Sequence, residues 1–300
     1  MMKLIVSSCC CPRVKSSPPP PPPAGQPCLP TMEMEQRVVV MRHGDRLDHA
    51  EPIWPANKPR PWDPPLTDAG LLRAWTVGKG IRAAAAADGW AVHRVLVSPF
   101  LRCRQTAARA VAALCAVPDG DALLTIDDTA DVPLDTSRLK VSIECGLSEM
   151  MNTQAMGPIV SKVAPSVKKW FPDLPELEAV FPAGTIDHSA EPIYQEVPKW
   201  GESVLDARNR YASVIKTLAD KYPDENLLLV THGEGVGASV SYFEMGVEIY
   251  EVDYCAYSVM GRQVSMKSAE GFTAGSFKVL TKSGTTGIQY APVSEEWLVG

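Results

Sequence analysis

Residues 37–46 read RVVVMRHGDR, and this stretch decides the predicted fold. Its first six residues form an apolar run that ends in charge, which is typical of a buried strand in a parallel sheet. Comparable runs occur at residues 93–97, 140–145 and 226–230, and segments with helical spacing separate them. Strands that alternate with helices indicate an α/β fold. We therefore predict a three-layer α/β/α sandwich with a mostly parallel central sheet.

The predicted helices have recognisable first residues. Thr67 is a good N-cap for a helix whose apolar residues recur at three- and four-residue spacing. Ser98 and Pro99 form a second favourable pair, at the N-cap and first helical positions. Near the end of the chain, residues 252–260 and 277–281 are predicted to be edge strands.

The composition of the chain changes sharply near residue 35. Residues 1–35 are rich in proline, with six consecutive prolines at 18–23. Polyproline has no backbone N–H donors and cannot build a core, so we predict a disordered, solvated N-terminal arm. An organelle transit peptide, an interaction arm and translation from Met32 or Met34 all stay open for this segment. Residues 36–300 are predicted to form one domain, with an irregular insert at about 150–200.

The composition also excludes several classes of protein. With 45% hydrophobic and 21% charged residues, the 300-residue chain is typical of a soluble globular protein. Its apolar runs are far shorter than a membrane span needs, so we predict no membrane span. The net charge of −6 argues against a nucleic-acid binder. Eight cysteines without a C-x-x-C pair indicate free thiols in a reducing compartment, and we predict a cytoplasmic location.

The predicted strands end in residues that suit phosphoryl chemistry. In α/β sheets, ligands bind beyond the carboxyl ends of the strands. His43 follows the first strand and is flanked by Arg42 and Arg46. A neutral imidazole is a competent nucleophile, and guanidinium groups bind phosphate oxygens in forked pairs. Gly44 permits a tight turn and a close approach of the backbone.

Three further residues extend this pattern. Arg102 is predicted in the first turn of a helix, where free N–H groups and the helix dipole help to bind an anion. Glu149 follows the third strand and His232 follows the fourth. Together they supply cationic stabilisation and a carboxylic acid that can protonate a leaving oxygen. Taken singly, each also fits a surface loop or a structural side chain, and we interpret Arg104 and Arg109 as solvated.

Six sequence blocks, in this order, resemble those of the histidine phosphatase superfamily, which has a phosphoglycerate-mutase-like fold. The blocks are RHGDR (42–46), PLTDAG (65–70), SPFLRCRQTA (98–107), ECGLSE (144–149), GES (201–203) with Arg210, and VTHG (230–233). The resemblance implies that His43 is transiently phosphorylated and that Glu149 is the proton donor. It implies no metal and no cofactor. The residues that it implies in the phosphate pocket are Arg42, Arg102 and His232, and those expected to bind substrate are Gly44, Arg46, Glu202 and Ser203.

Within this superfamily, the blocks at 42–48 and 98–107 look closest to a eukaryotic branch. That branch includes the suppressor of T-cell receptor signalling proteins and ecdysteroid-phosphate phosphatase. Cofactor-dependent mutases typically read R-H-G-x-S-x-x-N, whereas this chain has Arg46 and His49 at the serine and asparagine. This departure disfavours mutase activity. Phosphatases of the branch carry Glu-Pro-Gly at residues 144–146, where this chain reads ECG, so the substrate stays open.

We therefore predict a metal-independent phosphomonoesterase that acts through a phosphohistidine on His43. Its substrate class is a phosphorylated small molecule or a phosphoprotein. Two alternatives stay open: a phosphoglycerate mutase-type phosphotransferase, and a weakly catalytic interaction protein that binds a phosphorylated ligand. Glu144, Asp45 and Glu202 are rivals of Glu149 for the role of proton donor. A homodimer stays open as well.

Overall fold

A computed structural model describes residues 32–51, 58–117, 132–267 and 271–293 of the chain. Most of the predicted N-terminal arm therefore lies outside the described residues. Its last part, residues 32–35, belongs instead to the first strand, β1 (Met32–Arg42), and pairs with residues 263–266. The boundary predicted at residue 35 is thus too late. The apolar run does not reach residues 32–35, but the backbone of these residues still pairs with a strand far along the chain.

Within the described residues, seven strands form one mixed sheet in the order β3–β2–β4–β1–β6–β7, with β8 paired to β6. The strands that run parallel to β1 or to one another are β2 (Arg94–Val97), β3 (Lys140–Ile143) and β4 (Leu227–Thr231). The strand β6 (Tyr257–Lys267) pairs antiparallel with β1, β7 (Gly271–Ala274) and β8 (Lys278–Val279). The prediction of an edge strand at residues 252–260 is wrong, because β6 is covered on both sides by other strands.

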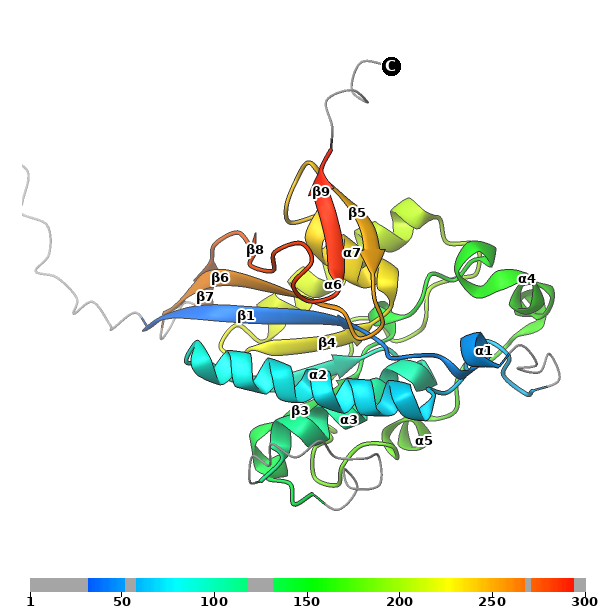
Figure 1. The fold of residues 1–300 in the computed structure, drawn as a ribbon, viewed down its shortest axis with the longest axis horizontal. Coiled ribbons are helices and arrows are strands. Elements are labelled where there is room, and N and C mark those ends of the chain that lie inside the picture. The colour runs from blue at the N-terminus through cyan, green and yellow to red at the C-terminus, as the bar shows by residue number, and fades with distance from the viewer. Residues whose placement is uncertain (1–31, 52–57, 118–131, 268–270, 294–300) are drawn as a thin grey trace, which may run out of the picture.

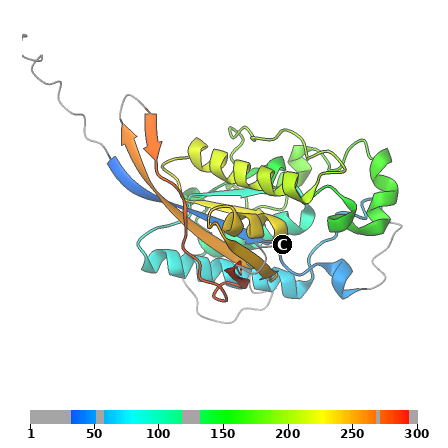
Figure 2. The same cartoon turned by 90° about the horizontal axis from the view of Figure 1, so that it is seen from above.

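Helices cover both faces of this sheet (Figure 2). Val39 and Met41 pack on one face against α2 (Asp68–Ala87) and α3 (Leu101–Cys115). Val38 and Val40 point to the other face, where α6 (Val204–Lys221) and α7 (Gly233–Ser241) lie. Successive side chains of a strand point to opposite faces, so a strand between two helical layers is apolar at every position. The predicted three-layer fold with a mostly parallel sheet is confirmed.

The two predicted helix starts have different outcomes. Thr67 is the N-cap of α2, and its hydroxyl accepts a hydrogen bond from the Gly70 N–H at 3.0 Å. Ser98 does not cap α3, which begins only at Leu101. The Leu101 N–H donates instead to the Asp63 carboxylate at 2.6 Å, from a segment far back along the chain. A loop carboxylate thus replaces the local cap and leaves the Ser98 hydroxyl available to another partner.

The remaining elements lie around the sheet (Figure 1). The insert at residues 150–200 contains α4 (Thr153–Val163) and α5 (Leu174–Glu178), and is joined to β3 by a bridge between Val141 and Ile186. The other short elements are α1 (Leu47–Ala50), the 3₁₀ turns at Thr136–Arg138, Cys145–Leu147 and Ala164–Ser166, and a two-stranded sheet of β5 (Val247–Val252) and β9 (Ile288–Pro292).

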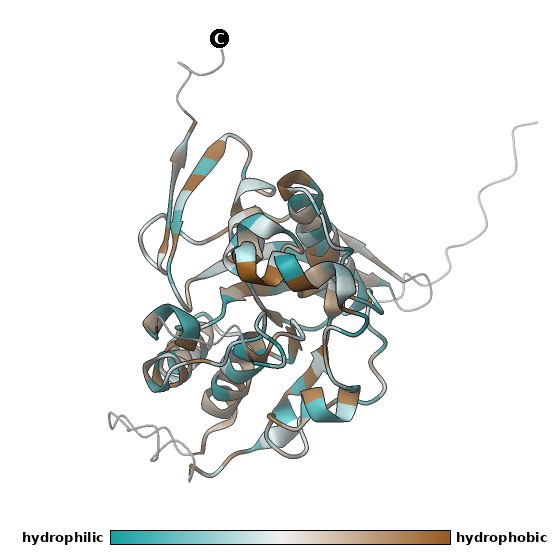
Figure 3. Ribbon diagram, turned by 90° about the vertical axis from the view of Figure 1, so that its right-hand side faces the viewer, coloured by the Kyte–Doolittle hydropathy of each residue, from teal (hydrophilic) through white to brown (hydrophobic). Residues whose placement is uncertain are grey.

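Most helices of the fold are two-sided in hydropathy, and hydrophilic and hydrophobic residues alternate along their ribbons (Figure 3). This pattern belongs to helices that cover a core with one side and meet water with the other. No helix in the described part of the chain has the length and apolar character of a membrane span.

Candidate active site

The two histidines of the predicted site lie side by side because their strands are neighbours. Arg42 and Thr231 are partners in the parallel pairing of β1 with β4. Each strand ends there, and the next residue in each chain segment is a histidine. The backbone N–H of His43 donates to the Thr231 carbonyl at 3.0 Å. The rings of His43 and His232 approach edge to face, with centroids 5.4 Å apart.

His43 is held in the form that a nucleophile requires. Its side chain is buried, and its Nδ1 lies 2.9 Å from the Gly44 carbonyl oxygen. A carbonyl only accepts, so Nδ1 carries the proton and Nε2 has a free lone pair. Burial, and after it the charge of Arg102, holds the pKa of His43 well below its usual value. The ring is therefore neutral at physiological pH.

The turn after His43 rests directly on the first turn of α2. A side chain at Gly44 would meet the Gly70 carbonyl oxygen at 2.8 Å, and one at Gly70 would meet the Asp45 backbone at 2.7 Å. The Gly44 N–H donates to the Thr106 hydroxyl at 2.9 Å. The blocks at 65–70 and 98–107 thus fix the backbone that carries His43.

Two guanidinium groups converge on the histidines with unused donors. Arg102, in the first turn of α3, is 2% exposed and lies over the ring of Phe100. Arg42 donates to the Val252 carbonyl and lies over the Tyr254 ring. The Nε atoms of both arginines are buried without a hydrogen-bond partner among the described residues. Buried N–H groups without partners are costly, so this site is built to receive an anion.

Arg46 adds positive charge beside this group. Its guanidinium pairs with both oxygens of Asp48, at 3.0 and 2.6 Å. Its charge nevertheless acts on Arg102. Burial is the main cause that lowers the pKa of Arg102, and the positive charge of Arg46 is the second. Like charges that lower one another's pKa mark a site of positive potential.

Glu149 and His232 form a buried pair. Oε2 of Glu149 lies 3.1 Å from Nδ1 of His232 and 3.4 Å from Nη2 of Arg102. Nε2 of His232 lies 2.9 Å from the Ser98 hydroxyl, the group left available when Asp63 caps α3. Burial lowers the pKa of His232 to about 4 against an opposing contribution from Glu149. Burial alone would raise the pKa of Glu149, but His232 and Arg102 outweigh it and lower that pKa.

The three rival carboxylates have other partners. Glu144 is buried and accepts backbone N–H groups of Gly146, Ile193 and Tyr194, so it attaches the insert to the core. Asp45 pairs with Arg73. Glu202 forms a two-point ion pair with Arg210, at 2.7 and 2.8 Å. Among the described residues, none of these carboxylates forms a hydrogen bond or ion pair with His43, Arg102 or His232.

Glu202 and Ser203, which the resemblance places among the substrate-binding residues, have other partners in the structure. Glu202 acts through Arg210, which also donates to the Gly146 and Ser148 carbonyls and so supports the loop that carries Glu149. Ser203 is the N-cap of α6 and is bonded to Asp206, so the structure does not bring it to the centre.

The solvated interpretation of Arg104 is wrong. This guanidinium is buried and donates to the Pro99 and Leu177 carbonyls, because the insert folds over it. Arg109 is only partly exposed. Exposure of a helix face is set by what packs on it, and the local spacing of residues carries no sign of this.

Sequence reasoning missed Tyr254. Its ring lies 4.4 Å from the Arg42 guanidinium carbon and 5.8 Å from the His43 ring, and its hydroxyl bonds His49 at 2.6 Å. The next residue, Cys255, has a φ of 59° and donates its N–H to the His43 carbonyl. Such a backbone conformation is strained for a residue other than glycine and is held by its surroundings. No motif marks this turn, and the sequence pattern predicts a strand at residues 252–260 instead.

A metal ion fits this centre poorly. Ligand atoms of His43, Glu149 and His232 lie within 4.8 Å of one another, a spacing that could hold a cation. However, the Arg102 guanidinium lies 3.4 Å from the Glu149 oxygen, and Arg42 also faces the group. Two fixed positive charges oppose a cation and favour an anion at the same place.

Comparison with known proteins supports the predicted resemblance. The model of the histidine phosphatase superfamily (branch 1) matches residues 127–265, which contain Glu149 and His232. This match agrees with the resemblance that the sequence blocks predict. No curated protein matches the chain by sequence.

Three solved structures show what the chain is similar to. The ecdysone phosphate phosphatase from Bombix mori, solved with tungstate, is 20% identical, with a TM-score of 0.53 over 88% of this chain and 100% of that chain. A phosphoglycerate mutase from Bacillus anthracis is 14% identical (TM-score 0.45, 81% and 92% covered). A phosphoserine phosphatase from Entamoeba histolytica is 15% identical (TM-score 0.40, 81% and 96% covered). The first likeness confirms the predicted resemblance at the level of fold, and the family match supports phosphatase activity in general.

Proposed function

We propose that this protein is a metal-independent phosphomonoesterase that acts through a phosphohistidine on His43. The observation that carries the proposal is the pairing of a neutral, buried His43 with two guanidinium groups whose Nε–H donors have no partner. A phosphoryl group placed there receives hydrogen bonds from Arg42 and Arg102 on its non-reacting oxygens. Its phosphorus then faces the free lone pair of His43 Nε2.

In the first step, Nε2 of His43 forms a bond to phosphorus while the bond to the leaving oxygen breaks. The leaving oxygen takes a proton from Glu149. Without a bound phosphate, His232 and Arg102 keep this carboxyl ionised. A bound phosphate dianion draws the Arg102 charge to itself, so the pKa of Glu149 rises toward the range in which it carries a proton.

In the second step, Glu149 accepts a proton from water as the water oxygen attacks phosphorus. The bond from phosphorus to Nε2 breaks, inorganic phosphate leaves and His43 returns to its starting form. Its Nδ1–H stays on the Gly44 carbonyl throughout and fixes the ring. Neutral His232, held between Ser98 and Glu149, donates to the phosphoryl oxygens or to Glu149 as charge moves.

The first experiment tests the nucleophile. His43→Ala is expected to abolish hydrolysis of p-nitrophenyl phosphate and to prevent radiolabelled phosphoryl transfer to the protein, measured after an alkaline quench. The exposed His188 provides the control, since His188→Ala should keep both. Activity of His43→Ala near that of the wild type would refute the phosphohistidine. Transfer of phosphoryl groups to 3-phosphoglycerate in the presence of 2,3-bisphosphoglycerate would favour a mutase instead.

The second experiment tests the proton donor. Glu149→Gln keeps the shape of the side chain but cannot donate, so its defect should grow with the pKa of the leaving group. An alkyl phosphate is expected to slow by ~10²-fold more than p-nitrophenyl phosphate, the low end of a general-acid contribution. Glu202→Gln is the matched variant and should slow both substrates alike. If instead Glu202→Gln shows the leaving-group dependence, Glu149 is not the acid.

A further inference from the structure

Residues 62–67 lie between the loop that carries the nucleophile and the first turns of α3, and they bond to both. On the side of the nucleophile, the Leu47 N–H donates to the Pro65 carbonyl at 2.9 Å. On the side of α3, the Leu66 N–H donates to the Gln105 side-chain oxygen at 2.8 Å. This segment therefore joins the two parts of the chain between which a phosphoryl group would bind.

Two residues at the start of the segment hold Arg102 by its backbone and by its side chain. The Asp63 carboxylate accepts a hydrogen bond from the N–H of Leu101, directly before Arg102, at 2.6 Å. The Trp62 carbonyl accepts a hydrogen bond from Nη1 of Arg102 at 3.2 Å. Trp62, Asp63 and Arg102 are all buried, and a hydrogen bond is electrostatically stronger in such surroundings than in water.

These bonds decide which donor of Arg102 is left for a ligand. Nη1 bonds the Trp62 carbonyl, and Nη2 lies 3.4 Å from Glu149 and 3.2 Å from His232. Nε is buried and has no hydrogen-bond partner among the described residues. Recognition of a phosphate by a planar guanidinium depends on its orientation, so a small rotation or shift of Arg102 would misdirect this donor.

The same helix cap also affects His232. Ser98 and Pro99 have the sequence of a local cap, but Asp63 takes that place and α3 begins only at Leu101. The Ser98 hydroxyl instead lies 2.9 Å from Nε2 of His232. One carboxylate from a distant segment thus bears on two groups of the candidate active site.

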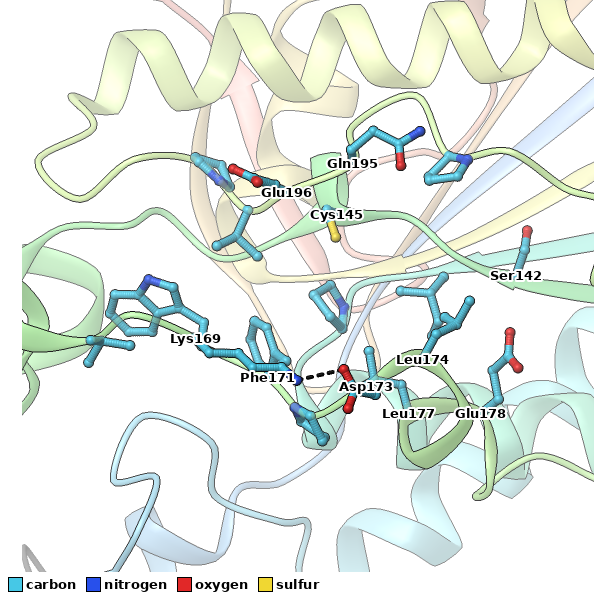
Figure 4. A pocket seen from close by; sticks show the side chains of 18 of the residues that line it. Ser142, Cys145, Lys169, Phe171, Asp173, Leu174, Leu177, Glu178, Gln195 and Glu196 are labelled. Atoms are coloured by element: carbon cyan, nitrogen blue, oxygen red, sulfur yellow. Dashed lines mark hydrogen bonds and ion pairs between the residues drawn. The ribbon is translucent and has the colours of Figure 1, made fainter.

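The insert supports the first turn of α3 from another side. Phe171 packs edge to face on Phe100, with ring centroids 4.8 Å apart, and the Leu177 carbonyl accepts a hydrogen bond from Arg104 at 3.1 Å. Figure 4 shows Phe171 and Leu177 on the wall of the cavity that the insert forms beside β3. Asp63 lies 4.0 Å from Arg104 but takes no part in these two contacts. We therefore expect a variant of Asp63 to keep α3 and to lose the position of its first turn.

We propose that Asp63 is a positioning residue of the phosphate site: as the cap of α3, it fixes the backbone beside Arg102 so that the Nε–H of this arginine faces the phosphoryl group. This inference rests on the function proposed above, because it requires a phosphoryl group at Arg102.

The first test is the binding of inorganic phosphate, measured by calorimetry. Asp63→Ala removes the cap and should raise the phosphate Kd by ~10-fold, a factor that matches the usual effect of one helix cap. Asp63→Asn keeps an oxygen of equal capping strength and should bind phosphate within ~3-fold of the wild type. Asp63→Glu keeps the charge but moves the oxygen by one methylene, so its Kd should rise as well. Wild-type affinity in Asp63→Glu with weak binding in Asp63→Asn would assign the effect to charge and overturn the proposal.

The matched control is Glu144→Ala. Glu144 is another buried carboxylate that accepts backbone N–H groups, and it has no hydrogen bond or ion pair with Arg102 in the described part of the chain. Its removal should leave the phosphate Kd unchanged. An equal rise of the Kd in Glu144→Ala and Asp63→Ala would show a general effect of destabilisation and overturn the role of Asp63.

The second test asks whether Asp63 acts through Arg102. In the wild-type background, Asp63→Ala should lower kcat/KM for p-nitrophenyl phosphate by ~10-fold. In the Arg102→Lys background, which lacks the Nε–H, the same change should cost less than ~3-fold, because the effects of coupled residues are not additive. Equal losses in both backgrounds would overturn the proposal.

The phosphate titration also separates this inference from the function on which it rests. Failure of the wild type to bind inorganic phosphate would contradict the proposed function. Binding by the wild type with an unchanged Kd in Asp63→Ala would overturn the role of Asp63 and leave the proposed function in place.

Discussion

Acidification is expected to destabilise the folded protein through His232, which provides a direct test of the charge state of the site. The ring is fully buried, and its pKa falls from 6.5 to about 4 on folding. Between pH 6.5 and about 4, His232 therefore binds a proton in the unfolded chain but stays neutral in the folded protein. Stability that is present above pH 6.5 is lost as the pH falls toward 4.

The magnitude follows from the two pKa values. Between pH 7 and pH 5, a group with a pKa of 6.5 unfolded and about 4 folded lowers the free energy of unfolding by about 2 kcal/mol. His43 shifts in the same direction and adds to the loss in the wild type. Glu149 titrates below its usual range and leaves this pH window undisturbed.

The assay is urea unfolding of wild type and His232→Asn at pH 7 and pH 5, without phosphate. The variant should lose stability less steeply than the wild type, by about 2 kcal/mol over this interval. His188→Asn, at an exposed histidine, should follow the wild type. If wild type and His232→Asn lose the same stability between the two pH values, His232 is not held neutral by burial and the reasoning fails.

Three further outcomes are expected. Tyr254→Leu removes the ring over Arg42 and should raise KM for p-nitrophenyl phosphate by ~5-fold. Tyr254→Phe keeps the ring and should have a KM near that of the wild type. Equal defects in the two variants would assign the effect to the hydroxyl. Glu144→Ala leaves three backbone donors unpaired and should lower the free energy of unfolding by about 3 kcal/mol, measured in urea. A changed ratio of alkyl to aryl phosphate rates in that variant would contradict its structural role. Turnover should persist in excess EDTA, and a loss reversed by a divalent ion would refute metal independence.

The order of the strands and helices along the chain can be predicted from short stretches of the sequence. The apolar runs around Val39, Val95, Val141 and Leu228 predict buried strands, and the structure places all four in the parallel part of the sheet. Parallel strands bring their carboxyl ends to one edge, so the sequence also predicts that residues after these strands meet. Arg42, His43, Arg102, Glu149 and His232 are near one another for this reason, and their chemical roles stay predictions.

Other features depend on partners that local pattern does not name. Ser98 has the sequence of a helix cap, but Asp63 takes that position and Ser98 bonds His232. Arg104 has the sequence of a solvated residue, but the insert covers it. Both predictions failed because a side chain's environment is set by segments distant in the chain.

The sequence by itself thus determined the α/β layers, the strand ends and the residue types that phosphoryl transfer needs, because periodicity and side-chain chemistry are properties of short segments. Only the tertiary structure decided which carboxylate reaches His232, that Tyr254 lies over Arg42, and that Phe171 packs on Phe100. Each of these is a contact between residues far apart in the chain. Such contacts are selected by packing and by the pairing of buried polar groups, which act only once the chain has folded.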